Sequence, residues 1–224
     1  AEYRPHPLLF GQVDKGTYKM VIFAQFAVGF AIAGYLTWLQ GLPVMVFSVL
    51  GVLFGVFYTA GPIKLKYRTL GEVSVFLAFG PLMVGGAFYA ITGKFSWDPL
   101  LASTPIGLLI ALVLLANNLR DRKFDANVGI STMATGATED QGMRYFTALT
   151  ASAYISVIAL ILLGIFSPFA LLSFLSIKTA MEIIRQFSEK IPLTSDQQTA
   201  QLALQFGVLL TAGELVNVLY YTFF

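Results

Sequence analysis

Seven apolar runs, most of them roughly 20 residues long, constrain this chain more than any other feature of its sequence. An α-helix rises about 1.5 Å per residue, so about 20 residues cover the roughly 30 Å hydrocarbon core of a bilayer. The sequence therefore predicts an all-α, polytopic transmembrane helical bundle, organised as one membrane domain over residues 1–224. After a polar lead-in at 1–17, the expected helices lie near residues 18–38, 43–60, 72–92, 99–117, 144–163, 166–185 and 200–223.

Composition agrees with a membrane protein and excludes several kinds of active site. Hydrophobic residues make up 57% of the chain and charged residues 12%, which excludes a conventional soluble core. There is no cysteine, so disulfides, thiolate metal sites and cysteine nucleophiles are excluded. The single histidine, His6, leaves neither a Ser-His-Asp triad nor a His-rich metal site. The net charge of +2 gives no indication of nucleic acid as a partner.

Thirteen of the fourteen Lys and Arg residues fall on one side of the expected helices. They are Arg4, Lys15, Lys19, Lys64, Lys66, Arg68, Arg120, Arg122, Lys123, Arg144, Lys178, Arg185 and Lys190. The opposite side holds only Lys94. The positive-inside rule therefore predicts that the N-terminus and the basic loops are cytoplasmic and that the C-terminus is outside. We expect an integral protein of the cytoplasmic membrane of a bacterium or archaeon, with the lipid bilayer as its surroundings.

A polar stretch at residues 117–125 follows the fourth apolar run and is the first candidate for chemistry. If the helix continues, Asp121 and Asp125 lie on one face, with Asn117 and Asn118 one turn earlier. A carboxylate pair of this kind suits Mg²⁺, which takes oxygen ligands and commonly binds substrate phosphates as well. For the pair alone, a solvated helix end at the membrane surface is the alternative interpretation.

A basic loop on the same predicted side changes that interpretation. It contains Lys64, Lys66 and Arg68 and follows Tyr58 at the end of an apolar run. Several cations beside a carboxylate-bound Mg²⁺ are what a diphosphate needs, because its negative oxygens must be neutralised together. A diphosphate next to an apolar helical cavity indicates a lipid diphosphate, with its tail inside the bundle and its head at the interface.

Two segments carry a resemblance to a known family. They are Tyr58-Thr-Ala-Gly61-Pro62-Ile-Lys64, with Leu70-Gly71-Glu72 after it, and Asn117-Asn118-Leu-Arg120-Asp121-x-x-x-Asp125-x-x-x-Gly129. Together they resemble the UbiA superfamily of intramembrane prenyltransferases, over a region from about residue 40 to the end of the chain. The Asn-Asn-x-Arg-Asp form is most similar to the MenA type, 1,4-dihydroxy-2-naphthoate polyprenyltransferase. Residues 192–194 and 198–201 also resemble the C-terminal part of that family.

The resemblance implies a bundle of nine helices around a central cavity, with two Asp-rich motifs that bind a Mg²⁺-diphosphate. Asp121 and Asp125 match the second motif and would be the catalytic metal ligands. The residues that would contact the substrate diphosphate are Asn117, Asn118, Arg120, Lys64, Lys66, Arg68 and Tyr58. The reaction would transfer the prenyl group of a polyprenyl diphosphate to an aromatic acceptor, and for the MenA type that acceptor is 1,4-dihydroxy-2-naphthoate on the route to menaquinone.

The first Asp-rich motif and the first two helices of the family have no counterpart in this sequence. Before the first apolar run the acidic residues are Glu2 and Asp14, without the family spacing, and Ile130-Ser131-Thr132 stands where MenA-like sequences are basic. Two explanations remain open: an N-terminal part is absent from the sequence, or the first metal site is lost. The second would make the protein a non-catalytic UbiA-like subunit of a larger membrane complex. A third hypothesis keeps the enzyme but changes the acceptor, to a (bacterio)chlorophyllide or a glycerol phosphate.

Two acidic residues lie inside the expected helices. Glu72 opens the 72–92 helix, where its charge interacts favourably with the helix N-terminus. Glu214 falls near the middle of the last helix, where an ionisable group is costly. We expect Glu214 to be protonated inside the bundle or hydrogen-bonded to Asn217.

Overall fold

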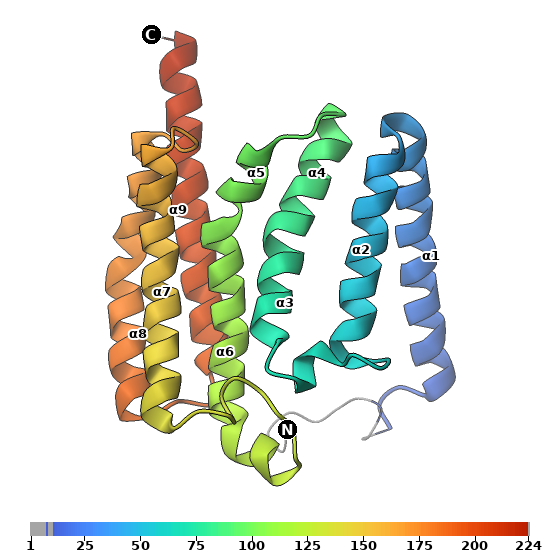
Figure 1. The fold of residues 1–224 in the computed structure, drawn as a ribbon, viewed down its shortest axis with the longest axis vertical. Coiled ribbons are helices and arrows are strands. Elements are labelled where there is room, and N and C mark those ends of the chain that lie inside the picture. The colour runs from blue at the N-terminus through green and yellow to red at the C-terminus, as the bar shows by residue number, and fades with distance from the viewer. Residues whose placement is uncertain (1–7, 9–10, 224) are drawn as a thin grey trace.

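The computed structural model describes residue 8 and residues 11–223 of the 224-residue chain. Glu2, Arg4 and His6 lie outside these described residues. The regular elements of the described part are helices, as Figure 1 shows, and the β-bridge recorded among its residues is an isolated one between Arg68 and Ser131. The all-α prediction is confirmed.

The helices follow one another in the order that the apolar runs predicted. They are α1 (Lys15–Gln40), α2 (Leu42–Thr59), α3 (Gly71–Leu77), α4 (Met83–Thr92), α5 (Trp97–Ala102), α6 (Thr104–Asn127), α7 (Glu139–Leu162), α8 (Ile177–Glu189) and α9 (Ser195–Phe223). Three shorter segments complete them: the 3₁₀ helices η1 (Leu65–Tyr67) and η3 (Pro168–Ser176), and the π-helical turn η2 (Ala78–Leu82).

Within the described part of the chain, six stretches are long and apolar enough to cross a membrane. They are Lys15–Gln40, Leu42–Thr59, Gly71–Thr92, Trp97–Asn127, Glu139–Leu162 and Ser195–Phe223. The chain is therefore an integral membrane protein with a polytopic helical architecture.

The expected helix at 166–185 is where the structure departs from the sequence prediction. Residues Pro168–Ser176 form η3, and α8 begins only at Ile177. Ser173 Oγ donates to the Ala170 carbonyl at 2.8 Å, and Ser176 Oγ donates to the Ser173 carbonyl at 2.6 Å. Hydroxyls that bond nearby carbonyls offer the backbone an alternative to the regular helical pattern. This run is consequently divided between two elements, and it is not one of the six continuous stretches.

The expected helix at 72–92 is kinked rather than straight. Pro81 has no backbone N–H to donate, and Gly80 takes the non-helical angles φ −92° and ψ −105°. A Cβ atom on Gly80 would lie 3.4 Å from the Gly107 Cα of α6. Small residues at this crossing therefore let the α3–α4 path approach α6 closely.

Helix α1 begins earlier than expected because Asp14 caps it. The Asp14 carboxylate accepts hydrogen bonds from the Gly16 and Thr17 backbone N–H groups at 2.8 and 3.0 Å, and one from the Thr17 hydroxyl. The bond from the Thr17 hydroxyl, followed by the backbone bonds, holds the pKa of the Asp14 carboxyl below its ordinary value.

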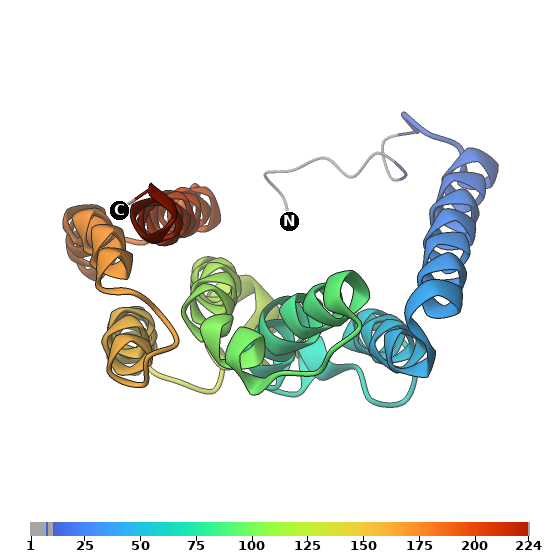
Figure 2. The same ribbon diagram turned by 90° about the horizontal axis from the view of Figure 1, so that it is seen from above.

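Seen from above, the helices form an open arc with α1 at one end and α9 near the other (Figure 2). Helix α6 packs against α7 and α9, and α9 packs along η3. This half contains the buried core, whose largest side chains include Leu109, Leu112, Phe146, Leu202 and Phe206. Helix α1 packs on α2 and α4 and has no buried residue.

The polar connections gather at one end of the bundle. The segments at 61–70, 128–138 and 190–194 all lie at the bottom of Figure 1. The Thr69 N–H donates to the Ser131 carbonyl at 3.3 Å and joins the first two of these segments directly. The basic loops that the sequence grouped on one side are therefore neighbours in the fold.

Glu214 has a different partner from the one that we expected. The Ser167 backbone N–H and hydroxyl donate to Glu214 Oε1 at 3.0 and 3.1 Å. The carboxylate therefore ties α9 to the start of η3, in place of a bond to Asn217 within its own helix.

Candidate functional site

The polar end of α6 is helical as far as Asn127, beyond the end expected near residue 117, so the condition for a shared carboxylate face is met. The helix runs to Asn127, so Asn117, Asp121 and Asp125 share a face. Apolar residues earlier in the helix, including Leu112 and Leu115, are fully buried and anchor it between its neighbours. The polar residues are thus held on a rigid element at the loop end of the bundle.

Arg120 connects this helix to the start of α9. Its Nε and Nη2 atoms donate to the two carboxylate oxygens of Asp121 at 2.9 and 3.0 Å. Its Nη1 atom donates to Asp196 Oδ1 at 2.6 Å and to the Leu193 carbonyl at 3.2 Å, and Nη2 also donates to Asn117 Oδ1 at 2.5 Å. The Arg120 side chain is only 5% exposed, so this planar, two-pronged pairing is well shielded from water.

Asp196 is a site residue that sequence reasoning missed. It lies in the first turn of α9, where an acidic residue is explained by the helix dipole alone. Its partner Arg120 is 76 residues earlier in the chain, and no spacing rule connects the two. The sequence feature that could have drawn attention to Asp196 is its position in an acidic first helical turn shortly after Pro192.

Asn118 points to a different neighbour. Its Nδ2 donates to Glu72 Oε1 at 2.9 Å, and the exposed fractions of Asn118 and Glu72 are 1% and 4%. This bond joins α6 to the first turn of α3, directly after the basic loop. The Asn118 amide would have to share or release this partner to contact a diphosphate. Glu72 lies in the first turn of a helix, as we expected, but the sequence did not reveal its bond to Asn118.

The basic loop lies beside the same end of α6. Lys66 is within electrostatic range of Asp125, and its Nζ lies 5.8 Å from the centroid of the Tyr67 ring. Arg68 donates to the Pro62 carbonyl at 3.1 Å. Lys64 takes left-handed backbone angles, φ 48° and ψ 59°, which are costly for a residue with a side chain. Lys64 and Arg68 are exposed at the loop surface.

Tyr58 lies at the last turn of α2, where the basic loop begins. It is half-buried and within electrostatic range of Glu72 and Tyr67. The structure therefore brings Tyr58, Lys66, Asn118 and Asp125 to one end of the bundle.

The carboxylates at this end could supply the protein ligands of a magnesium ion, with the substrate supplying the others. Asp121 and Asp125 supply two carboxylates from one helix face, and each interacts electrostatically with the other. Mg²⁺ is commonly held by one or two protein carboxylates together with substrate phosphate oxygens. Among the described residues, no group of three or more His, Cys, Asp or Glu side chains is placed to hold a metal. Asp121 would share its oxygens between the ion and Arg120.

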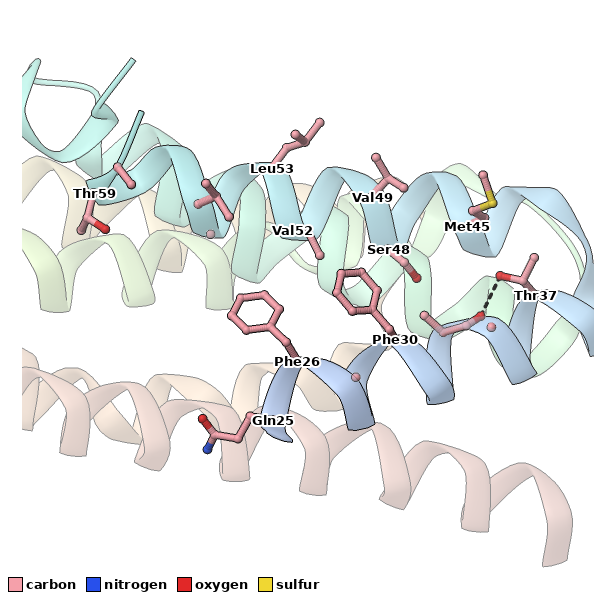
Figure 3. Close-up of a pocket in the computed structure, with 17 residues that line it drawn as sticks. Gln25, Phe26, Phe30, Thr37, Met45, Ser48, Val49, Val52, Leu53 and Thr59 are labelled. Atoms are coloured by element: carbon pink, nitrogen blue, oxygen red, sulfur yellow. Dashed lines mark hydrogen bonds between the residues drawn. The ribbon is translucent and has the colours of Figure 1, made fainter. Parts of the chain in front are cut away.

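A long apolar groove runs between α1 and α2 (Figure 3). Its volume is about 940 Å³, and the rings of Phe26 and Phe30 point from α1 toward α2. The hydroxyl of Thr37 is already bonded to the Ala33 carbonyl at 2.7 Å. The groove reaches Thr59, next to the basic loop. The groove is therefore mainly apolar along its length and ends beside charged groups.

These features define a class of protein: a polytopic helical membrane protein with a charged site at one end of its helices and an apolar groove beside it. A family model narrows the class. The chain belongs to the UbiA prenyltransferase family, whose model matches residues 2–209.

The chain is similar to several curated relatives. It is 30% identical over 174 residues to the 1,4-dihydroxy-2-naphthoate octaprenyltransferase of Bacillus subtilis, covering 76% of this chain and 56% of that protein. It is 33% identical over 168 residues to the UbiA prenyltransferase domain-containing protein 1 of Dictyostelium discoideum, covering 75% and 51%. The human protein of the same name is 31% identical over 166 residues, covering 73% and 48%. The chain thus spans about half the length of these relatives. No solved structure matches it.

Proposed function

We propose that this protein is an intramembrane prenyltransferase that moves a polyprenyl group from its diphosphate to an aromatic acceptor. One observation carries the proposal. In this member of the UbiA family, Asp121, Asp125 and Lys66 lie together at the loop end of an apolar helical bundle. The proposed acceptor is 1,4-dihydroxy-2-naphthoate, for menaquinone biosynthesis, because the Bacillus relative carries the name of that activity.

In the proposed site Asp121 and Asp125 would hold Mg²⁺, which would supply positive charge for the leaving diphosphate. Lys64, Lys66 and Arg68 add positive charge from the loop. The further diphosphate contacts that we propose are Asn117, Asn118, Arg120 and Tyr58. The guanidinium of Arg120 also fixes the orientation of Asp121 through its paired hydrogen bonds.

The reaction breaks the bond to the diphosphate, forms one carbon–carbon bond, and then breaks one bond at the attacked ring carbon. The C–O bond between the allylic carbon and the diphosphate breaks, and its electron pair leaves with the diphosphate. A π-electron pair of the aromatic ring forms the new C–C bond to the prenyl carbon. The attacked ring carbon then loses a proton or, where it carries a carboxylate, carbon dioxide. Charge stabilisation on the leaving diphosphate is therefore the main task of the side chains.

The apolar groove between α1 and α2 is a suitable position for the prenyl chain of the substrate. It extends along α2 from Met45 to Thr59, which is about 21 Å at 1.5 Å per residue, and it ends next to the basic loop. A diphosphate beside Lys66 would leave its tail free to follow this groove. We also propose that this end of the bundle faces the cytoplasm, since it carries the basic loops.

The test is an acceptor panel with the protein in native membranes or lipid nanodiscs and a labelled polyprenyl diphosphate. Prenylation of 1,4-dihydroxy-2-naphthoate alone is the expected result. Transfer to a chlorophyllide or a glycerol phosphate instead would reassign the acceptor. Absence of transfer to every acceptor, with stable co-purification of partner membrane proteins, would contradict the enzyme and favour the non-catalytic subunit.

A further inference from the structure

A second pocket of about 660 Å³ lies on the other side of α6. Its lining comes from α3, α6, α7 and the connection before α7, and it includes Glu72, Leu115, Ala148 and Ser152. Most of the wall is apolar. The volume is within the range of small-molecule sites, about 300–1,000 Å³.

The helical period turns Asp121 away from this pocket, and Asn118 lies between the two around α6. Leu108, Ala111 and Leu115 line it at spacings of three and four residues, so they form one face of α6. Asp121 is six residues beyond Leu115, which places it about 120° away around the helix. In Figure 2, α3, α6 and α7 follow one another along the arc, and α9 lies near α6 on the inner side of the arc. We therefore assign the pocket to the outer side of the arc, since its lining comes from α3, α6 and α7 and not from α9, and we call it the outer pocket.

Glu72 gives this apolar pocket a polar end with unmet hydrogen-bonding capacity. Oε1 accepts the bond from Asn118, but Oε2 is buried and has no hydrogen-bond partner among the described residues. The Asn118 Oδ1 atom is also buried and has no hydrogen-bond partner among the described residues. A buried acceptor without a donor is costly, so a ligand that brings a donor to this end of the pocket would be stabilised there.

We propose that the outer pocket binds a membrane-dissolved lipid alcohol, a molecule with one hydroxyl group on an apolar chain. Its hydroxyl donates to Glu72 Oε2, and its chain lies along the apolar wall beside Ala148. An anionic head is disfavoured because both unmet groups are acceptors. A charged amine would lose its hydration on leaving the membrane surface, whereas a hydroxyl enters from the bilayer without that cost. The proposal does not depend on the prenyltransferase activity.

The test is photo-crosslinking of the protein in lipid nanodiscs with a long-chain alcohol that carries a diazirine. We expect labelled peptides from α3 and α7. The methyl ether of the same probe, which cannot donate, labels them about tenfold less, as expected for one hydrogen bond to a buried acceptor. Ala148→Trp fills the pocket and abolishes the labelling. Ala151→Trp is the matched control, because Ala151 is exposed on the same helix outside the pocket lining, and it retains the labelling.

Three results would overturn the proposal. Equal labelling by the alcohol and its ether would show that no donor is recognised. Labelling that survives Ala148→Trp would show contact with bulk lipid only. A matched amine probe that labels these peptides more strongly than the alcohol would identify a cationic head instead. Loss of prenyl transfer alone would leave these results unaffected, so the two proposals fail separately.

Discussion

Arg120 holds two acidic side chains from two different helices, Asp121 on α6 and Asp196 on α9. Because the Arg120 side chain is 5% exposed, its removal takes a shielded guanidinium away from both carboxylates. The same bonds fix the direction of Asp121, which we propose as a metal ligand. The Arg120 guanidinium therefore contributes to both the stability and the proposed chemistry of this end of the bundle.

We predict that Arg120→Ala lowers the free energy of unfolding by about 3 kcal/mol, the usual cost of breaking a buried ion pair. Arg120→Lys keeps the charge but loses the two-pronged geometry, and it should recover only part of the loss. Thermal unfolding in detergent measures both variants. A double-mutant cycle with Asp196→Asn provides the control, and additive effects would show that the two residues do not interact.

The pair formed by Glu72 and Asn118 allows a second prediction at the residue scale. Glu72→Gln keeps an acceptor for Asn118 Nδ2 and replaces the unpaired carboxylate oxygen with an amide donor, so stability should be retained or increased. Glu72→Leu leaves the buried Asn118 amide unsatisfied and should cost about 1–3 kcal/mol. Denaturation curves of the two variants compare them directly, and equal losses would argue against this bond.

The helices differ in how closely they approach each other, and α9 with η3 is the tightest case for a single residue. A Cβ atom on Gly213 would lie 2.1 Å from the Phe169 carbonyl oxygen, a distance that backbone atoms cannot relieve without moving. A Cβ on Gly34 of α1 would meet nothing within 4 Å. These two helical glycines therefore form a matched pair for a test of packing.

Gly213→Ala should destabilise the protein by about 1–3 kcal/mol, since η3 must shift away from α9. Gly34→Ala should be neutral or stabilising by up to about 1 kcal/mol, because alanine is the better helix former. Thermal unfolding of both variants in the same detergent separates packing from propensity. Similar losses in both would contradict the close approach of η3 to α9.

At the scale of elements, the sequence predicted what apolar run length can predict. Helices α1, α2, α7 and α9 lie near their expected positions, whereas α6 continues through Asp125, past the end that run length predicted near residue 117. The 3₁₀ segment Pro168–Ser176 did not follow from hydropathy, which does not register the bonds from its serine hydroxyls to nearby carbonyls. The kink at Gly80 had a visible cause in Pro81, but its packing on Gly107 depends on a residue in another helix.

For the whole molecule, the sequence predicted which end carries the charged groups but not how they are paired. Lys66 and Asp125 were expected on the same side, and they are close in the fold. The bond from Arg120 to Asp196 and the outer pocket required the packing of three or more helices, which no local pattern contains. The open arc leaves α1 with no buried residue, so its surroundings are lipid or further helices.

The orientation in the membrane is a prediction about the whole molecule. The chain has no cysteine, so a single introduced thiol reports its own position. Ser131→Cys, exposed at the loop end, should react with an impermeant maleimide only from the cytoplasmic side. Lys94→Cys, exposed at the other end, should react only from outside. The reverse pattern would invert the proposed topology.

The most direct test of the proposed function compares prenyl transfer by the wild-type protein with transfer by Asp121→Ala/Asp125→Ala. The measurement is labelled product formed from polyprenyl diphosphate and 1,4-dihydroxy-2-naphthoate, with and without Mg²⁺. Asp140→Ala removes an exposed carboxylate from the first turn of α7 and serves as the control. We predict Mg²⁺-dependent transfer that is lost in the double variant and kept in the control. Transfer that persists in the double variant would contradict the assignment of the site to this end of α6.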